Sequence, residues 1–148
     1  MTIIADVADA VAGELATGTF SKAVAVERHW RPRVKLDEAG PDDPVIVMVV
    51  PKSWGAEVLD RRGTAKTIEI DVAVVRKLGD PAGDDAAVDA LMDLVEEIAE
   101  FFEMRRLTGC PKAAWKRSER DPIYHVPHMD ELRQFTGVVT LTYLVVRS

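Results

Sequence analysis

A few side chains that are capable of metal or nucleophilic chemistry lie in the last third of the chain. His125 and His128 have His-x-x-His spacing, Tyr124 stands beside them, and Cys110 lies upstream. A structural zinc site needs four ligands, and a catalytic one usually takes three from the protein. Two histidines on a proline-interrupted segment do not supply that set. We therefore expect no metal site, and packing or hydrogen bonding is the favoured role of these histidines.

The other reactive residues lack the partners that catalysis requires. A cysteine nucleophile needs a base, and nothing in the sequence brings a histidine to Cys110. Ser53 and Ser118 have no nucleophile-elbow context. No glycine-rich phosphate-binding loop follows a predicted strand. The sequence therefore predicts no catalytic residue and no cofactor, so that the protein is not an enzyme.

Residues 103–120, which we call the basic segment, hold six basic and two acidic side chains. They include Arg105, Arg106, Lys112, Lys116 and Arg117. Basic residues interleaved with an aromatic residue, here Trp115, could bind phosphates and stack a base. One tryptophan is a weak pattern, however, and the net charge of -6 disfavours nonspecific attraction to DNA. A solvated loop and a surface complementary to an acidic partner remain the two interpretations.

Residues 84–102 are predicted to form an acidic amphipathic helix. This segment contains seven carboxylates and no lysine or arginine. Four of them recur every fourth residue and therefore lie on one helix face: Asp85, Asp89, Asp93 and Glu97. Each like-charge pair at this spacing costs roughly 0.2–0.5 kcal/mol in an isolated helix. This face is either simply solvated, or it meets a basic surface, or it lines a channel that must not adhere to DNA.

Length and composition limit the classes of protein to which the chain can belong. The chain has 148 residues, 47% hydrophobic and 30% charged, which is typical of one globular domain spanning residues 1–148. The longest apolar run, Val45–Pro51, is far shorter than the roughly 20 residues of a membrane helix. There is no pattern of a secretory signal, and a single cysteine fits a reducing compartment. We expect a protein made in the cytoplasm, with no membrane partner.

Hydrophobic periodicity predicts the elements that must position these residues. Helical spacing begins at Ile4 after a possible Thr2 cap and ends near Gly18. Period-2 alternation predicts strands at 20–30, 66–77 and 135–147, and the run 45–50 predicts a strand covered on both faces. We expect the first two strands to form an antiparallel hairpin, residues 51–65 to break the pattern, and residues 103–134 to be a long irregular loop.

These elements predict an α+β fold in the order α-β-β-β-α-β. It consists of a mostly antiparallel sheet of four strands, or slightly more, with two main helices packed on it. The three tryptophans, Trp30, Trp54 and Trp115, fall at strand ends or in loops, where they serve either as interface anchors or as packing at the core edge.

The order of elements over nearly the whole chain resembles the tail terminator family of long-tailed bacteriophages, the minor tail proteins that cap the tail tube. The segments that carry the resemblance are the opening helix at 3–11, Phe20-Ser21 to Trp30-Arg31-Pro32, Val45–Pro51, Asp60-Arg61-Arg62, the acidic helix at 91–98, and Gln134-Phe135-Thr136-Gly137-Val138. Related head-to-tail joining and tail-completion proteins share this size.

The resemblance implies a ring, typically of six subunits, that ends polymerisation of the tail tube and docks to the head connector. The partners implied are further copies of the chain, the tube protein and the connector protein. DNA passes through the lumen without specific binding. The implied location is the virion tail, assembled in the bacterial cytoplasm. Interface candidates are Trp30, Trp54, Arg61, Arg62, Asp85, Asp89, Asp93, Glu97, Arg105, Arg106, Lys112, Trp115, Lys116 and Arg117.

The alternative is a small α+β ligand-binding domain or metal-dependent enzyme. Its site would lie under the 103–134 loop and use Tyr124, His125 and His128. Ring formation or concentration-dependent association would favour the assembly interpretation. A strict monomer that holds a metal or small molecule tightly would favour the alternative.

Overall fold

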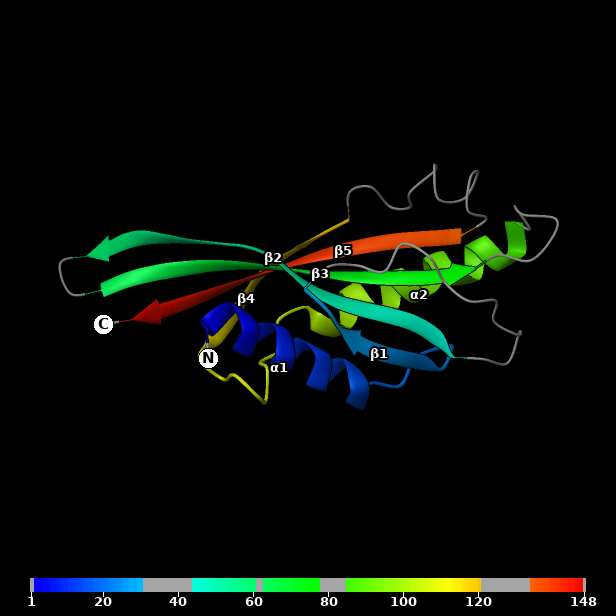
Figure 1. Cartoon of the computed structure of the whole chain (residues 1–148), viewed down its shortest axis with the longest axis horizontal. Coiled ribbons are helices and arrows are strands. Elements are labelled where there is room, and N and C mark those ends of the chain that lie inside the picture. The colour runs from blue at the N-terminus through cyan, green and yellow to red at the C-terminus, as the bar shows by residue number, and fades with distance from the viewer. Residues whose placement is uncertain (1, 31–43, 61–62, 78–84, 121–133, 148) are drawn as a thin grey trace.

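The computed structural model describes residues 2–30, 44–60, 63–77, 85–120 and 134–147 (Figure 1). The elements are, in chain order, α1 (Ile3–Thr17), β1 (Val24–Arg28), β2 (Val45–Asp60), β3 (Gly63–Lys77), α2 (Asp85–Phe102), β4 (Ala113–Glu119) and β5 (Gln134–Arg147). This is an α+β fold with two helices and a mostly antiparallel sheet, as the sequence predicts.

Within the described residues, the sheet has five strands in the order β1-β2-β3-β5-β4. The pairs β2–β3, β3–β5 and β5–β4 are antiparallel, and β5 is an interior strand, as predicted. The pairing of β1 with β2 is parallel, so the predicted antiparallel hairpin is wrong. The alternation of side chains is the same for either direction, and the connection at 29–44 is long enough for the crossover that parallel strands require.

Both helices pack on one face of the sheet. Helix α1 lies against β1, β2 and β3, and α2 lies against β5 and β4. The Thr2 hydroxyl caps α1 by accepting a hydrogen bond from the Ala5 backbone N–H at 3.3 Å. The predicted apolar stripe of α2 is buried, from Leu91 to Phe102. No helix in the described part of the chain is long and apolar enough to span a membrane.

The main core forms where the helices meet the alternating side chains of the three long strands. On β3 and β5 its members are Ile68, Ile70, Val72, Val74, Phe135, Val139, Leu141, Tyr143 and Val145. Each fully buried aliphatic or aromatic side chain contributes about 1.5–3 kcal/mol. A second buried cluster on the opposite face contains Met48, Val50, Ala73 and Val75. This explains why residues 45–50 are apolar on both sides, as predicted.

The predicted break at residues 51–65 is instead a long hairpin, because β2 continues to Asp60 and β3 begins at Gly63. Pro51 is tolerated within β2 because β1 ends beside Val49 and leaves the outer edge of β2 without a neighbour among the described strands. Figure 1 shows the ends of β2, β3 and β5 projecting together beyond the helices.

The predicted irregular loop at 103–134 contains strand β4, so this expectation is also wrong for its first half. The first strand is likewise shorter than the predicted 20–30. In β4 the register shifts between Trp115 and Arg117, so Lys116 is an extra, bulged residue. A bulge interrupts the alternation of inward and outward side chains, which is why period 2 could not be recognised in so short a strand.

Candidate functional site

Trp30 is the most prominent exposed aromatic side chain among the described residues. It lies just past the end of β1 and is 59% exposed. The guanidinium carbon of Arg28 is 4.9 Å from the centroid of its ring, and Arg28 Nε donates a hydrogen bond to Asp9 Oδ1 at 2.7 Å. Because Asp9 belongs to α1, the helix holds the cation that supports the indole ring. Trp30 is therefore both exposed and preorganised, as an interface anchor should be.

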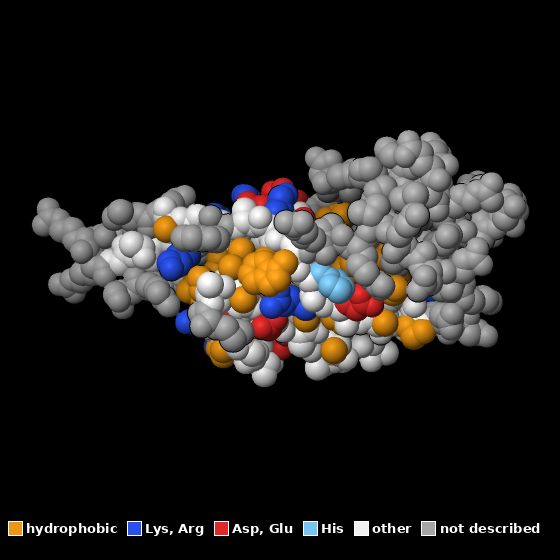
Figure 2. Space-filling model, in the orientation of Figure 1, with side chains coloured by type: hydrophobic (Ala, Val, Ile, Leu, Met, Phe, Trp, Pro, Cys, Tyr) orange, Lys and Arg blue, Asp and Glu red, His pale blue; other side chains and the backbone are white. Residues whose placement is uncertain are grey.

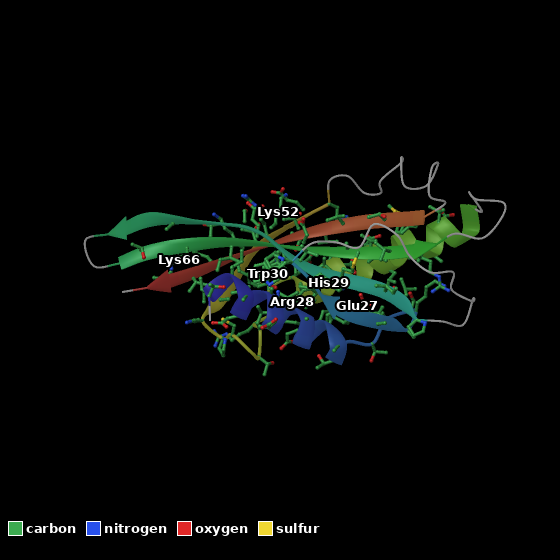
Figure 3. All side chains as sticks on the ribbon, in the orientation of Figure 1. Glu27, Arg28, His29, Trp30, Lys52 and Lys66 are labelled. Carbon is green, nitrogen blue, oxygen red and sulfur yellow. The ribbon has the colours of Figure 1, made fainter. Side chains whose placement is uncertain are left out.

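The neighbourhood of Trp30 combines exposed apolar side chains with ion-paired polar ones. Figure 3 shows Trp30 near the centre of the view, between Arg28, His29 and Lys52, and Figure 2 shows exposed apolar side chains there, flanked by basic ones. His29 Nε2 lies 2.8 Å from Glu27 Oε1, and its backbone N–H donates to the Val49 carbonyl oxygen at 3.0 Å. This last bond continues the pairing with β2 up to the residue before Trp30.

The opposite edge of the sheet is formed by β4 and carries exposed basic residues. Lys112 and Lys116 are exposed, as is Arg106 in the preceding turn, whereas Arg117 Nε lies 3.0 Å from Glu119 Oε1. Trp115 is only partly buried, packs against the main core and donates from Nε1 to Ser118 Oγ at 3.0 Å. Of its two predicted roles, the structure therefore places Trp115 at the core edge.

Arg105 belongs to the predicted basic surface, but its contacts are internal. Arg105 Nη1 lies 3.2 Å from Oε2 of Glu14, whose side chain is only 6% exposed. The Thr108 backbone N–H donates to the other Glu14 oxygen at 2.7 Å. Hydrogen bonds from Thr108, assisted by Arg105, lower the pKa of Glu14 despite its burial. Arg105 also donates to the Phe101 carbonyl oxygen at 3.0 Å, so it ties α1 to the end of α2.

The exposed carboxylates of α2, which we call the acidic face, are Asp89, Asp93, Glu96 and Glu100. No ion pair joins this face to the basic segment within the described parts of the chain. Glu97 is an exception to the predicted row, because it accepts hydrogen bonds from the backbone N–H of Ser21, at 3.0 Å, and from its hydroxyl. Glu97 therefore holds the segment that leads into β1.

Some of the predicted site residues are not placed by the structure. Arg61 and Arg62 lie outside the described residues, as do Tyr124, His125 and His128 of the alternative site. Trp54 and Asp85 are placed only through the backbone of β2 and α2. Within the described residues, no group of three or more histidine, cysteine, aspartate or glutamate side chains is positioned to hold a metal ion.

A depression of about 1000 Å³ lies between α1 and the 105–112 segment. Its lining includes Asp9, Glu14, Arg105, Cys110 and Lys112. Among the ionic groups in its wall, Asp9 pairs with Arg28, and Glu14 pairs with Arg105.

The hydroxyl of Tyr143 is buried without a hydrogen-bond partner among the described residues. Burial, and secondarily the negative charge of Glu14, raise the pKa of Tyr143. A buried polar group without a partner keeps its desolvation cost. We therefore expect Tyr143→Phe to leave the free energy of unfolding unchanged or to raise it by up to about 1 kcal/mol. Urea unfolding measures this change, and a loss comparable to that of a core truncation would contradict it.

The sequence did not point to Asp9, Glu14 or Arg28, although they organise these surfaces. Each is an ordinary charged residue on an amphipathic element, and its partner lies on another element. The only available indication was a carboxylate in the apolar stripe of the first helix, one residue before Leu15.

No protein-family model matches this chain, and no curated protein matches it at a significant level. The class that the structure itself defines is an α+β protein with a five-stranded sheet among its described residues and two helices on one face.

Proposed function

We propose that this chain is a structural subunit of a phage tail terminator ring, which caps the tail tube, ends its polymerisation and docks to the head connector. In this role the protein resides in the virion tail after assembly in the bacterial cytoplasm. The observation that carries the proposal is that the two edges of the sheet differ. One edge presents Trp30 supported by Arg28, and the other presents the exposed lysines 112 and 116.

A ring built by rotation needs two different complementary patches on opposite sides of each subunit. Strands β1 and β4 are the two outer strands of the described sheet, so their patches lie on opposite sides. Exposed tryptophan is enriched among the residues that dominate binding energy in interfaces. The resemblance in element order to tail terminators supports the same geometry and suggests a ring of about six copies.

Electron microscopy and native mass spectrometry of the purified chain test this proposal. Closed rings with a central hole, whose population rises with concentration, are expected. Because exposed lysines line one of the two patches, ring formation should also depend on salt. A chain that remains monomeric under all conditions and binds a metal ion or small molecule tightly would contradict the proposal.

The acidic face of α2 fits a ring through which DNA passes. Four exposed carboxylates without a cation on the same helix repel phosphates, so they prevent adhesion. We expect rings of the variant Asp89→Lys/Asp93→Lys to bind duplex DNA at least about tenfold more tightly than the wild type at low salt, with a steep loss as salt rises. Fluorescence anisotropy of labelled DNA measures this.

The matched control for this prediction is Asp89→Asn/Asp93→Asn, which removes the charge without reversing it. It should give an intermediate affinity and leave the helix intact by circular dichroism. Equal DNA binding by all three proteins would show that the acidic face does not line the DNA path.

A further inference from the structure

Strand β4 and the part of β2 beyond β1 form the two outer edges of the described sheet in this region, and they lie at the same level along the strands. Strand β1 pairs only with residues 45–49 of β2, so β2 has no outer neighbour from Val50 onward among the described strands. Two rows of paired residues cross the sheet in this region, each with one residue from β2, β3, β5 and β4 in that order. The first row contains Val50, Asp71, Thr140 and Glu119, and the second contains Ala56, Lys66, Val145 and Ala113. Strand β4 therefore spans the same part of the sheet as residues 50–56 of β2, on the opposite side.

The directions of the strands also match. Strand β4 is antiparallel to β5, β5 to β3, and β3 to β2, so β4 runs antiparallel to β2. Rotation about an axis along the strands preserves strand direction. The β4 edge of one copy would therefore meet the β2 edge of the next copy in antiparallel orientation, which suits regular backbone hydrogen bonding.

From this match we infer that β4 of one subunit pairs with residues 50–56 of β2 in the next subunit, and so joins the sheets of neighbouring copies. The inference rests on the proposed ring and names its interface. At matched level, Ala114 faces Gly55 and Ala113 faces Ala56 of the next copy. Small residues allow the close approach of two backbones.

Charge disfavours the pairing of two β4 edges. Residues 112–119 carry three basic side chains and one acidic side chain, whereas residues 50–56 carry only Lys52. Two β4 edges brought together would therefore repel more strongly than a β4 edge beside a β2 edge, which selects against twofold pairing through β4.

Both edges contain a bulged lysine, and the bulges lie at nearly the same level. Lys52 is the extra residue between Pro51 and Ser53, and Lys116 is the extra residue between Trp115 and Arg117. Ser53 and Arg117 share one row of the sheet through Glu69 and Thr142. Bulges and lysines normally prevent an edge from pairing with arbitrary strands. Here the two interruptions lie on either side of one row of the sheet, so the two interrupted edges match each other better than either matches a regular strand.

Trp30 flanks this seam. His29 donates the last described backbone hydrogen bond from the β1 side, to Val49, immediately before the part of β2 that has no outer neighbour among the described strands. Val50 lies in the same row of the sheet as Glu119, the last residue of β4. Trp30 would therefore contact the end of the neighbouring β4, where its exposed ring becomes buried.

Disulfide trapping tests the seam. In a Cys110→Ala background, the double variant Gly55→Cys/Ala114→Cys places one thiol on each edge, and the position of a Gly55 side chain is open space. Oxidation should produce a ladder of covalent oligomers at least about tenfold faster than for the control pair Gly55→Cys/Lys22→Cys, because assembly raises the effective concentration of only the first pair. Non-reducing gels and mass spectrometry read the ladder, and urea unfolding confirms that each variant folds.

The outcomes separate this inference from the proposed function. Rings of wild-type protein without a 55–114 ladder would overturn the seam and leave the ring proposal standing. A ladder together with open filaments would support the seam and count against a terminating ring. Cross-linking of Ala114→Cys alone as fast as the double variant would indicate twofold pairing of β4 strands and overturn the inference. Equal rates for the control pair would also overturn it.

Discussion

Replacing Trp30 with alanine is expected to weaken self-assembly by about 30-fold or more, the effect of losing an interface residue worth about 2 kcal/mol. The ring of Trp30 is exposed and is held by Arg28, which is itself bound to Asp9. Little side-chain entropy is therefore lost when a partner covers the indole. Analytical ultracentrifugation over a range of concentrations measures the change.

Two variants serve as controls for this prediction. Met104→Ala removes another exposed apolar side chain, 88% exposed, which belongs to none of the strands, and should leave assembly unchanged. Trp30→Phe keeps an aromatic ring and should retain part of the affinity. Because Trp30 is exposed, the stability of the isolated subunit should change by less than about 0.5 kcal/mol in all three proteins. Assembly of Trp30→Ala at the wild-type concentration would rule out this residue as an anchor.

Glu14→Gln is expected to lower the free energy of unfolding by about 1.5–3 kcal/mol at neutral pH, the range for buried hydrogen bonds to a charged group. The carboxylate of Glu14 accepts from the Thr108 backbone and pairs with Arg105. An amide keeps the shape but loses the charge and turns one acceptor into a donor. Urea unfolding measures the loss. Glu97→Gln, at a more exposed carboxylate bound to Ser21, is the matched control and should cost less.

The same interaction predicts how stability depends on pH. The folded-state pKa of Glu14 lies below the ordinary value of 4.5, chiefly because of the hydrogen bonds from Thr108. Its contribution is therefore fully present above that value and is lost as the pH falls through the folded-state pKa. The difference in stability between wild type and Glu14→Gln should shrink on acidification below pH 4.5. A difference that stays constant down to low pH would show that the charge of Glu14 does not contribute.

The elements whose signals are local could be predicted with good accuracy. The α1 helix and its Thr2 cap, the apolar stripe of α2, and the alternation of β3 and β5 all follow from residues close together in the chain. Each is a case in which propensity and periodicity agree. The exposure of Asp89 and Asp93 follows from the same local patterns, whereas the sequence left Trp30 open between an interface anchor and packing at the core edge.

The errors concern properties that depend on a partner strand. Pro51 suggested a break, but its missing N–H is harmless because β1 stops beside Val49. Strand β4 was not predicted because the bulged residue Lys116 interrupts its alternation, and a bulge is defined only against the neighbouring strand β5. The parallel direction of β1 likewise depends on where β2 lies and not on the residues of β1.

The α+β class, the two helices, most of the strands and the placement of charge along the chain could be predicted because they depend on spacing within a few residues. The contact of Glu14 with Arg105, the support of Trp30 by Arg28, and the level match between β4 and the part of β2 beyond β1 are properties of the folded chain. These relationships join residues far apart in the chain. Only the packing of the sheet against its helices brings such residues together.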